Sequence, residues 1–191
     1  NYRKAFGESD EQTLKAQYEL VGMLAYAGKF DEARELLDST DSLAGERTGG
    51  ENLMALRAAY LRGVLLVQQQ KVAEALPALE RADRLQRVVL KDDAQVAAGI
   101  RINLSDAYMR QERLKEAESL LKEALSDPMF ASNKIGEVYS SALHMNLARV
   151  LRNQGRYVEA LPLAQQAVAA TEKIMGPDQY QTLVQKSILA S

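Results

Sequence analysis

The sequence that decides the fold is Gly155-Arg156-Tyr157-Val158-Glu159-Ala160, because three earlier stretches of the chain superpose on it without a gap. These stretches are Gly28-Lys29-Phe30-Asp31-Glu32-Ala33, Gln70-Lys71-Val72-Ala73-Glu74-Ala75 and Glu112-Arg113-Leu114-Lys115-Glu116-Ala117. Their final alanines, Ala33, Ala75, Ala117 and Ala160, stand 42, 42 and 43 residues apart. A fixed period of this length is typical of repeat proteins, so we expect four copies of one structural unit.

Apolar residues on both sides of each stretch recur at helical spacing, for example Leu147, Val150 and Leu151 before the last one. Between these runs lie short polar breaks such as Gln154-Gly155-Arg156, which leave room only for a tight turn between two helices. The chain is rich in Ala and Leu and has only 4 Pro, which favours helix over strand. The pattern therefore predicts an all-α fold with one helical hairpin in each repeat.

Composition excludes several classes of function. The 191 residues include 26 acidic and 24 basic side chains, no Cys and 1 His, so thiolate nucleophiles, thiolate metal sites and His-rich metal sites are excluded, and we expect no cofactor. The near-neutral charge disfavours direct contact with nucleic acid, which usually needs a basic excess. No apolar run approaches the roughly 20 residues that span a bilayer, so we expect no membrane insertion.

Catalytic machinery is not visible. The lone histidine, His144, has no second His or Cys to complete a nucleophilic or metal-binding set. Acidic pairs such as Asp31/Glu32, Asp92/Asp93 and Glu116/Glu118 fit helix caps and solvated surfaces better than acid–base chemistry. We therefore expect a protein that is not an enzyme, with a carboxylate-based hydrolase as the remaining catalytic alternative.

At this point the chain resembles the tetratricopeptide repeat (TPR) family, in which pairs of antiparallel helices stack into a right-handed α-solenoid. The residues that carry the resemblance in the last repeat are Asn146-Leu147-Ala148, Leu151, Gly155, Tyr157, Glu159-Ala160 and Ala167. A period of 42 is similar to the long variety found in kinesin light chains and bacterial signalling proteins, where Gly and Thr-Leu open each repeat. Gly7 with Thr13-Leu14, and Gly176 with Thr182-Leu183, match that opening.

The resemblance implies a single array over residues 1–191, with repeats at about 9–48, 51–92, 93–134 and 136–176. Because the end repeats need a cover for their apolar faces, we expect a capping helix at about 178–190. The chain starts without Met and ends inside an apolar run, so we expect it to be a fragment of a longer protein.

Some residues depart from the repeat pattern. Gln70 and Glu112 replace the glycine of the turn, and Arg62 replaces the leucine of the first helix. Ser9 with Gln12 predicts a capping box at the first helix, and Asp92 or Asp93 is expected to cap the fifth.

The resemblance also implies a binding groove lined by the first helix of each repeat, with an asparagine before the inward leucine that grips a ligand backbone. Asn103 and Asn146 hold that place. Arg110, Arg149 and Arg152 would make the groove suit carboxylates, so an acidic ligand is expected. The 100° helical step adds further candidates on the same face, namely Met145, Asn153, Asp106, Tyr60 and Tyr18. The alternative is that these residues form the polar side of amphipathic helices, with the apolar ones packed between adjacent first helices.

We therefore expect a non-catalytic domain that binds a protein or an extended peptide. It would be a regulatory or scaffolding part of a larger, cytoplasmic protein, such as a bacterial signalling protein or transcription regulator. The alternative function is a homodimerisation module whose groove is idle.

Overall fold

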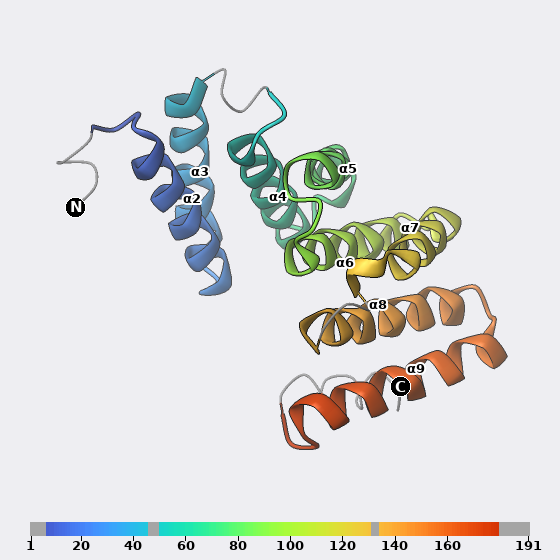
Figure 1. Ribbon diagram of the computed structural model, residues 1–191. Coiled ribbons are helices and arrows are strands. Elements are labelled where there is room, and N and C mark those ends of the chain that lie inside the picture. Colours follow the sequence, from blue (N-terminus) through green and yellow to red (C-terminus); the bar gives the residue numbers. More distant parts are fainter. Residues whose placement is uncertain (1–6, 46–49, 131–133, 180–191) are drawn as a thin grey trace. The chain divides into compact units, whose positions relative to one another are not determined.

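A computed structural model describes residues 7–45, 50–130 and 134–179 of the chain (Figure 1). Helices account for most of them, and no strand occurs in these three ranges. The helices within them are α2 (Glu11–Tyr26), α3 (Phe30–Ala44), α4 (Leu53–Gln68), α5 (Val72–Val89), α6 (Ala94–Arg110), α7 (Leu114–Ser126), the 3₁₀ helix η2 (Pro128–Phe130), α8 (Lys134–Asn153) and α9 (Tyr157–Met175). The predicted all-α fold class is confirmed.

The chain divides into two compact units, an N-terminal unit of residues 1–91 and a C-terminal unit of residues 92–191. Each predicted repeat range holds one pair of helices, and two repeats lie in each unit. Of the predicted capping helix at 178–190, Asp178 and Gln179 lie in a turn, and the remainder lies outside the described residues.

The turns inside the four hairpins share one backbone geometry. Gly28 and Gly155 have φ values of 76° and 78°, and Gln70 and Glu112, which replace glycine, have φ values of 62° and 57°. In each turn the next residue donates its N–H to a carbonyl five residues back, as Arg156 does to Leu151 at 2.9 Å. This bond is typical of the Schellman motif that ends a helix with a left-handed residue. The two non-glycine residues therefore keep the turn at a cost in backbone strain.

Side-chain caps fix where several helices begin. The Asp10 carboxylate accepts from Gln12 N at 2.9 Å at the start of α2, so the predicted cap at Ser9 is wrong by one residue. Asp93 accepts from Val96 N at 3.0 Å before α6, which confirms one of the two caps expected there.

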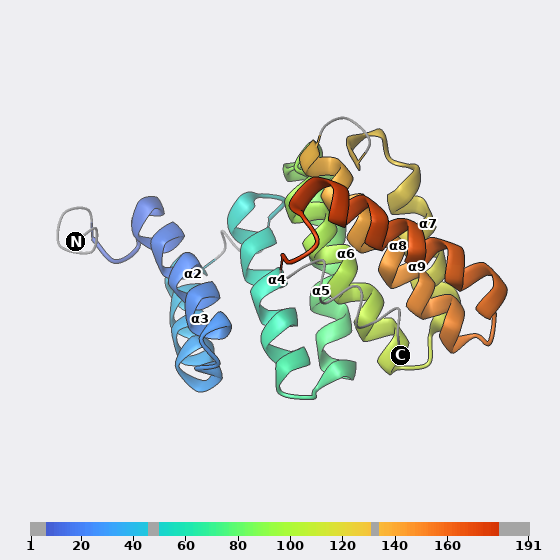
Figure 2. The same cartoon turned by 90° about the horizontal axis from the view of Figure 1, so that it is seen from below.

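In the N-terminal unit, α4 packs against both helices of the first hairpin (Figure 2). Leu14, Tyr18 and Leu37 of that hairpin form one buried cluster with Met54 and Ala58 of α4. Within the second hairpin, α4 and α5 approach closely at Gly63, where an added Cβ would lie 2.6 Å from Leu79. The first helix of one repeat thus completes the core of the repeat before it.

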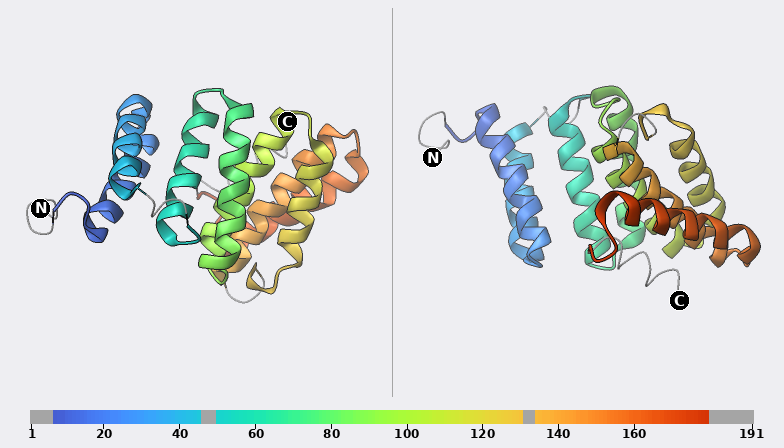
Figure 3. Two further views of the ribbon diagram at one scale, coloured as in Figure 1. Left: turned by 90° about the horizontal axis from the view of Figure 1, so that it is seen from above. Right: turned by 60° about the horizontal axis from the view of Figure 1, so that its bottom comes forward.

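In the C-terminal unit, α8 packs against α6 and α7 in the same way, and α9 pairs with α8 (Figure 3). Glu118 of α7 joins the two hairpins, because it accepts from Arg156 Nη1 at 2.8 Å and from Gln154 Nε2 at 2.9 Å. Hydrogen bonds from Lys122, Gln154 and Arg156 lower the pKa of the Glu118 carboxyl to about 2. The carboxylate therefore stays charged, and the link stays intact, at any ordinary pH.

The turn geometry leads to a stability prediction. Gly155→Ala is expected to lower the free energy of unfolding by about 1 kcal/mol, because a left-handed conformation costs an L-residue roughly 1–2 kcal/mol. Glu112→Gly should raise it by about 0.5 kcal/mol, since relief of that strain outweighs the added entropy of the unfolded chain. Urea denaturation followed by circular dichroism measures both. Gln111→Gly, where φ is −99°, is the matched control and should only destabilise; stabilisation by both glycines would refute the argument.

Candidate functional site

The candidate site is a polar surface on the neighbouring helices α6 and α8. It comprises Asn103, Asp106, Arg110, Asn146, Arg149, Arg152 and Asn153 and is called the α6–α8 polar face below.

Asp106 lies between two arginines of this face. Its carboxylate accepts from Arg110 Nε on the same helix at 2.8 Å and lies 3.4 Å from Arg149 Nη2 on α8. Asp106 and Arg149 stand 43 residues apart, so they hold equivalent positions in successive repeats, and their helices lie side by side. Both arginine side chains keep about a third or more of their surface exposed, at 43% for Arg110 and 34% for Arg149. The pairs therefore orient the guanidinium groups while leaving them accessible.

The two asparagines repeat one geometry. Asn103 donates from Nδ2 to the Gly99 carbonyl at 2.8 Å, and Asn146 donates to the Ala142 carbonyl at 3.0 Å, each four residues back on its own helix. Asn103 is half-buried, whereas Asn146 is buried and also accepts from Arg149 Nη1 at 3.0 Å. A carboxamide carries two N–H donors, so the bond to the helix uses only one of them.

Two further predicted residues lie at the end of the face. Asn153 is exposed on α8, and its Nδ2 lies 3.8 Å from the Met109 sulfur of α6. Arg152 is half-buried on α8. Eight of the ten predicted groove residues thus lie on the adjacent helices α6 and α8, and all of these except Met145 belong to the α6–α8 polar face.

The structure contradicts a groove position for Tyr18 and Met145. Tyr18, Tyr60 and Met145 occupy the same position in repeats one, two and four, and Tyr18 and Met145 are only 1% and 2% exposed. Tyr18 and Met145 are core residues, because their side chains face neighbouring helices rather than solvent. Tyr60 is half-buried on α4 in the N-terminal unit.

Sequence reasoning missed what Tyr18 does. Its hydroxyl donates to Asp41 Oδ1 at 2.8 Å, and Arg62 donates to Asp41 at 2.7 Å and to Asp38 at 3.1 Å. Burial is the main cause that raises the pKa of the Tyr18 hydroxyl above its usual range, and the hydrogen bond to Asp41 raises this pKa further. The signal was present in the sequence, since Arg62 stands where the other first helices have leucine. The network joins α2, α3 and α4 at the point where that leucine is absent.

Comparisons with known proteins give matches over most of the chain. Sequence profiles described as tetratricopeptide repeat match residues 18–87 and residues 97–127 and 145–180. No match was found among curated protein sequences.

Solved structures share the fold. Kinesin-light-chain TPR-like repeats of Podosopora anserina superpose with a TM-score of 0.71 at 23% identity, over 93% of this chain and 83% of that one. A variant of the same repeats gives 0.72 at 24% identity with the same coverage. BtubC (BKLC) of P. vanneervenii gives 0.70 at 16% identity, over 86% of this chain and 65% of that one.

None of the helices in ranges 7–45, 50–130 and 134–179 has the length and apolar character needed to cross a membrane.

The placement of Tyr18 is tested by Tyr18→Phe. Loss of the hydroxyl removes a hydrogen bond to the half-buried carboxylate of Asp41, so the free energy of unfolding should fall by about 1–2 kcal/mol. Tyr26→Phe on the same helix is the matched control, since Tyr26 is 97% exposed, and it should leave stability unchanged. Chemical denaturation gives both values, and equal effects of the two substitutions would contradict a core role for Tyr18.

Proposed function

Because this chain belongs to the tetratricopeptide repeat family, we propose that it binds an extended, acidic segment of a protein partner on its α6–α8 polar face. The tetratricopeptide repeat fold is typical of protein–protein interaction modules and is generally a non-catalytic scaffold. The observation that carries the proposal is the repeated asparagine geometry of Asn103 and Asn146 beside the paired arginines.

Charge supports an acidic ligand. The face carries three arginines, Arg110, Arg149 and Arg152, against one carboxylate, Asp106, which leaves a net charge of +2. The 3.4 Å pair between Arg149 and Asp106 is long and partly exposed, so it contributes little stability and an incoming carboxylate can replace it. Arg110 would keep its 2.8 Å bond to Asp106, so the ligand would meet a guanidinium group that is already held in place, which reduces the entropy lost on binding.

The amides support an extended backbone. An extended chain offers alternating N–H and C=O groups, and a carboxamide can satisfy both kinds. Asn146 keeps one N–H that has no partner among the described residues, and the equivalent Asn103 lies on the adjacent helix. Two amides on neighbouring helices would hold the backbone without selecting side chains, which leaves selectivity to the arginines.

The setting that we propose is a regulatory or scaffolding part of a larger cytoplasmic protein, of the kind found in bacterial signalling and transcription regulation. This part of the proposal rests on analogy of fold alone.

A binding measurement tests the ligand class. The probe is a fluorescein-labelled peptide of alternating Glu and Ser, with the corresponding Lys and Ser peptide as its counterpart, followed by fluorescence anisotropy. The Glu peptide alone should bind, and Arg149→Ala should weaken it by about tenfold, which corresponds to the roughly 1.4 kcal/mol expected from loss of a charged hydrogen bond. Asn103→Ala should also weaken binding.

The matched control is Arg84→Ala, an exposed arginine on α5 of the N-terminal unit, which should bind the Glu peptide as the native protein does. Equal binding of both peptides, or equal losses for Arg84→Ala and Arg149→Ala, would rule out the α6–α8 polar face.

A second candidate function, self-association, is favoured by an apolar stripe on α2. Leu20 and Met23 are 45% and 63% exposed, whereas Leu104 and Ala107, at the equivalent positions of the third repeat, are buried. Exposed apolar residues spaced along one helix are typical of an association surface.

Light scattering over a concentration series tests this candidate. If α2 is the interface, the native protein dimerises and Met23→Glu is monomeric, because a buried unpaired carboxylate opposes association. Val88→Glu, at an exposed position on α5, is the control and should still dimerise. A native protein that stays monomeric at every concentration would eliminate self-association.

A further inference from the structure

The first hairpin, formed by α2 and α3, packs on an apolar stripe of α4. The stripe consists of Met54, Ala58, Leu61 and Leu65, which follow one another at helical spacings of three and four residues. Met54, Ala58 and Leu65 are buried in one cluster with residues of the first hairpin, and Leu61 packs against that cluster. This stripe is called the α4 seam below. Burial of apolar surface along the α4 seam is one part of what holds the first hairpin in place.

Arg57 and Arg62 lie on opposite sides of the α4 seam and are the only charged residues of α4. The 100° helical step places each of them about 70° from the middle of the stripe. Arg57 Nη1 lies 3.4 Å from Glu19 Oε1 of α2. On the other side, Arg62 Nη2 donates to Asp41 of α3 at 2.7 Å and to Asp38 at 3.1 Å. Each helix of the first hairpin is therefore joined to α4 by ion pairs of its own.

These ion pairs remain open to water. Arg57, Arg62 and Glu19 keep between 31% and 62% of their side-chain surface exposed, and Asp41 is half-buried. Salt screens such pairs, because the Debye length falls from roughly 30 Å at 0.01 M ionic strength to roughly 3 Å at 1 M. Burial of apolar surface does not depend on charge and persists at high salt. The contact of the first hairpin with α4 thus has one part that responds to salt and one that does not.

The residues at the corresponding contact in the C-terminal unit differ. Leu147 of α8 stands 85 residues after Arg62, at the equivalent position, and is only 4% exposed. On the hairpin that precedes α8, Leu125 stands 84 residues after Asp41. Two leucines therefore take the positions of the strongest ion pair. The charged contact is a property of the N-terminal unit and not of the repeat in general.

We propose that the ion pairs of Arg57 and Arg62 control the docking of the first hairpin, so that a rise in ionic strength releases it from α4 and exposes the α4 seam. No residue changes its charge in this transition, since salt acts only by screening. The surface that becomes accessible is apolar. Met54, which is 8% exposed when the hairpin is docked, comes into contact with solvent when it is released.

Methionine oxidation measures this exposure. Hydrogen peroxide transfers one oxygen atom to the thioether sulfur and is itself reduced to water, and the rate depends on access to the sulfur. Dilute protein is treated at ionic strengths of about 0.01 M and about 1 M, set with NaCl, and the sulfoxide at each methionine is measured by mass spectrometry of tryptic peptides. Met23, which is 63% exposed, is the internal reference. Relative to Met23, Met54 should be oxidised about tenfold faster at high salt, because several partly exposed ion pairs weaken together.

The matched variant carries Arg57→Ala and Arg62→Leu. It gives α4 the residues that α8 has at these positions, Ala142 and Leu147. Its α4 seam has no charged residue on either side, so salt should not accelerate oxidation of Met54. Equal acceleration in the native protein and in this variant would overturn the proposal, and so would the absence of any acceleration in the native protein.

Arg34→Leu is the control for loss of an arginine as such. Arg34 pairs with Asp31 inside α3, at 3.4 Å, and does not join α3 to α4. This variant should therefore keep the full response of Met54 to salt. A response reduced as far as in the double variant would show that the net charge of the hairpin matters and not the ion pairs to α4, which contradicts the proposal.

Met145 distinguishes local release from unfolding of the whole chain. It is 2% exposed on α8, in the C-terminal unit, and should stay protected at high salt. Oxidation of Met145 in parallel with Met54 would mean that salt unfolds the protein, and the proposal would fail. If the double variant does not fold, as judged by circular dichroism, Glu19→Gln with Asp38→Asn removes ion pairs from the hairpin side and should reduce the salt response in the same way.

Discussion

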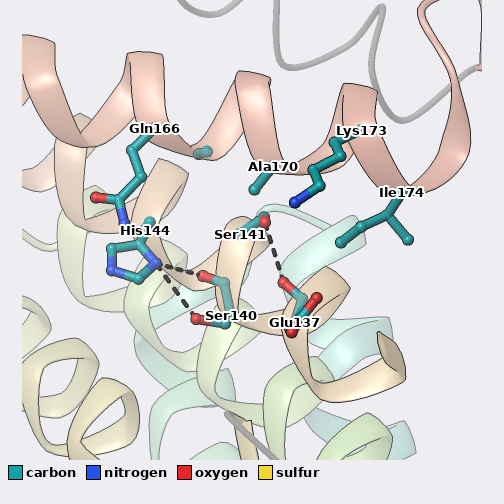
Figure 4. A pocket seen from close by; sticks show the side chains of 9 residues that line it. Glu137, Ser140, Ser141, His144, Gln166, Ala170, Lys173 and Ile174 are labelled. Atoms are coloured by element: carbon teal, nitrogen blue, oxygen red, sulfur yellow. Dashed lines mark hydrogen bonds between the residues drawn. The ribbon is translucent and has the colours of Figure 1, made fainter. Parts of the chain in front are cut away.

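A helical hairpin has two apolar sides and can cover only one of them by itself, and the rest of this structure depends on how the other side is covered. Ala97 and Ala98 are fully buried on α6, which packs against α8, and the buried Arg101 lies over the Phe130 ring of η2. In the fourth repeat, Ser140 corresponds to Ala97 and His144 corresponds to Arg101. Both residues are only half-buried, and both line a hollow of about 490 Å³ between α8 and α9 (Figure 4). Burial at one register position is therefore decided by the neighbour and not by the residue itself.

This constraint explains what could be predicted from the sequence. The helices, their pairing and the family follow from local signals, since a turn such as Gly155-Arg156 and a period of 42 are visible without knowledge of any distant contact. The 100° step also identifies which residues share a side of a helix, and it grouped Asp106 with Arg110 and Arg149 correctly. It cannot say whether that side meets another helix. Tyr18 and Met145 were misplaced for this reason.

Contacts between residues that are far apart in the chain could not be predicted from the sequence either. Asn146 and Arg149 are three residues apart, which suggests a pair, but the role of Asp106 depends on a contact across 43 residues of sequence. Arg62 shows the opposite case. A residue that breaks the repeat pattern marked a network of long-range bonds to Asp38 and Asp41, because the half-buried Asp41 carboxylate takes a charged partner that leucine cannot provide. In a repeat protein, a departure from the pattern deserves the same scrutiny as a match.

The two end surfaces of the described chain differ in a way that bears on assembly. The surface on α2 is apolar, with Leu20 and Met23, whereas the α8–α9 hollow is lined partly by Ser140, His144 and Lys173. Head-to-tail stacking would place the apolar stripe against the Lys173 ammonium group and remove water from it, which is unfavourable because a buried charge needs a partner. A contact between two α2 stripes has no such cost, because like surfaces meet about a two-fold axis and the contact closes on itself. Any self-association of this chain should therefore give a closed dimer rather than an open filament.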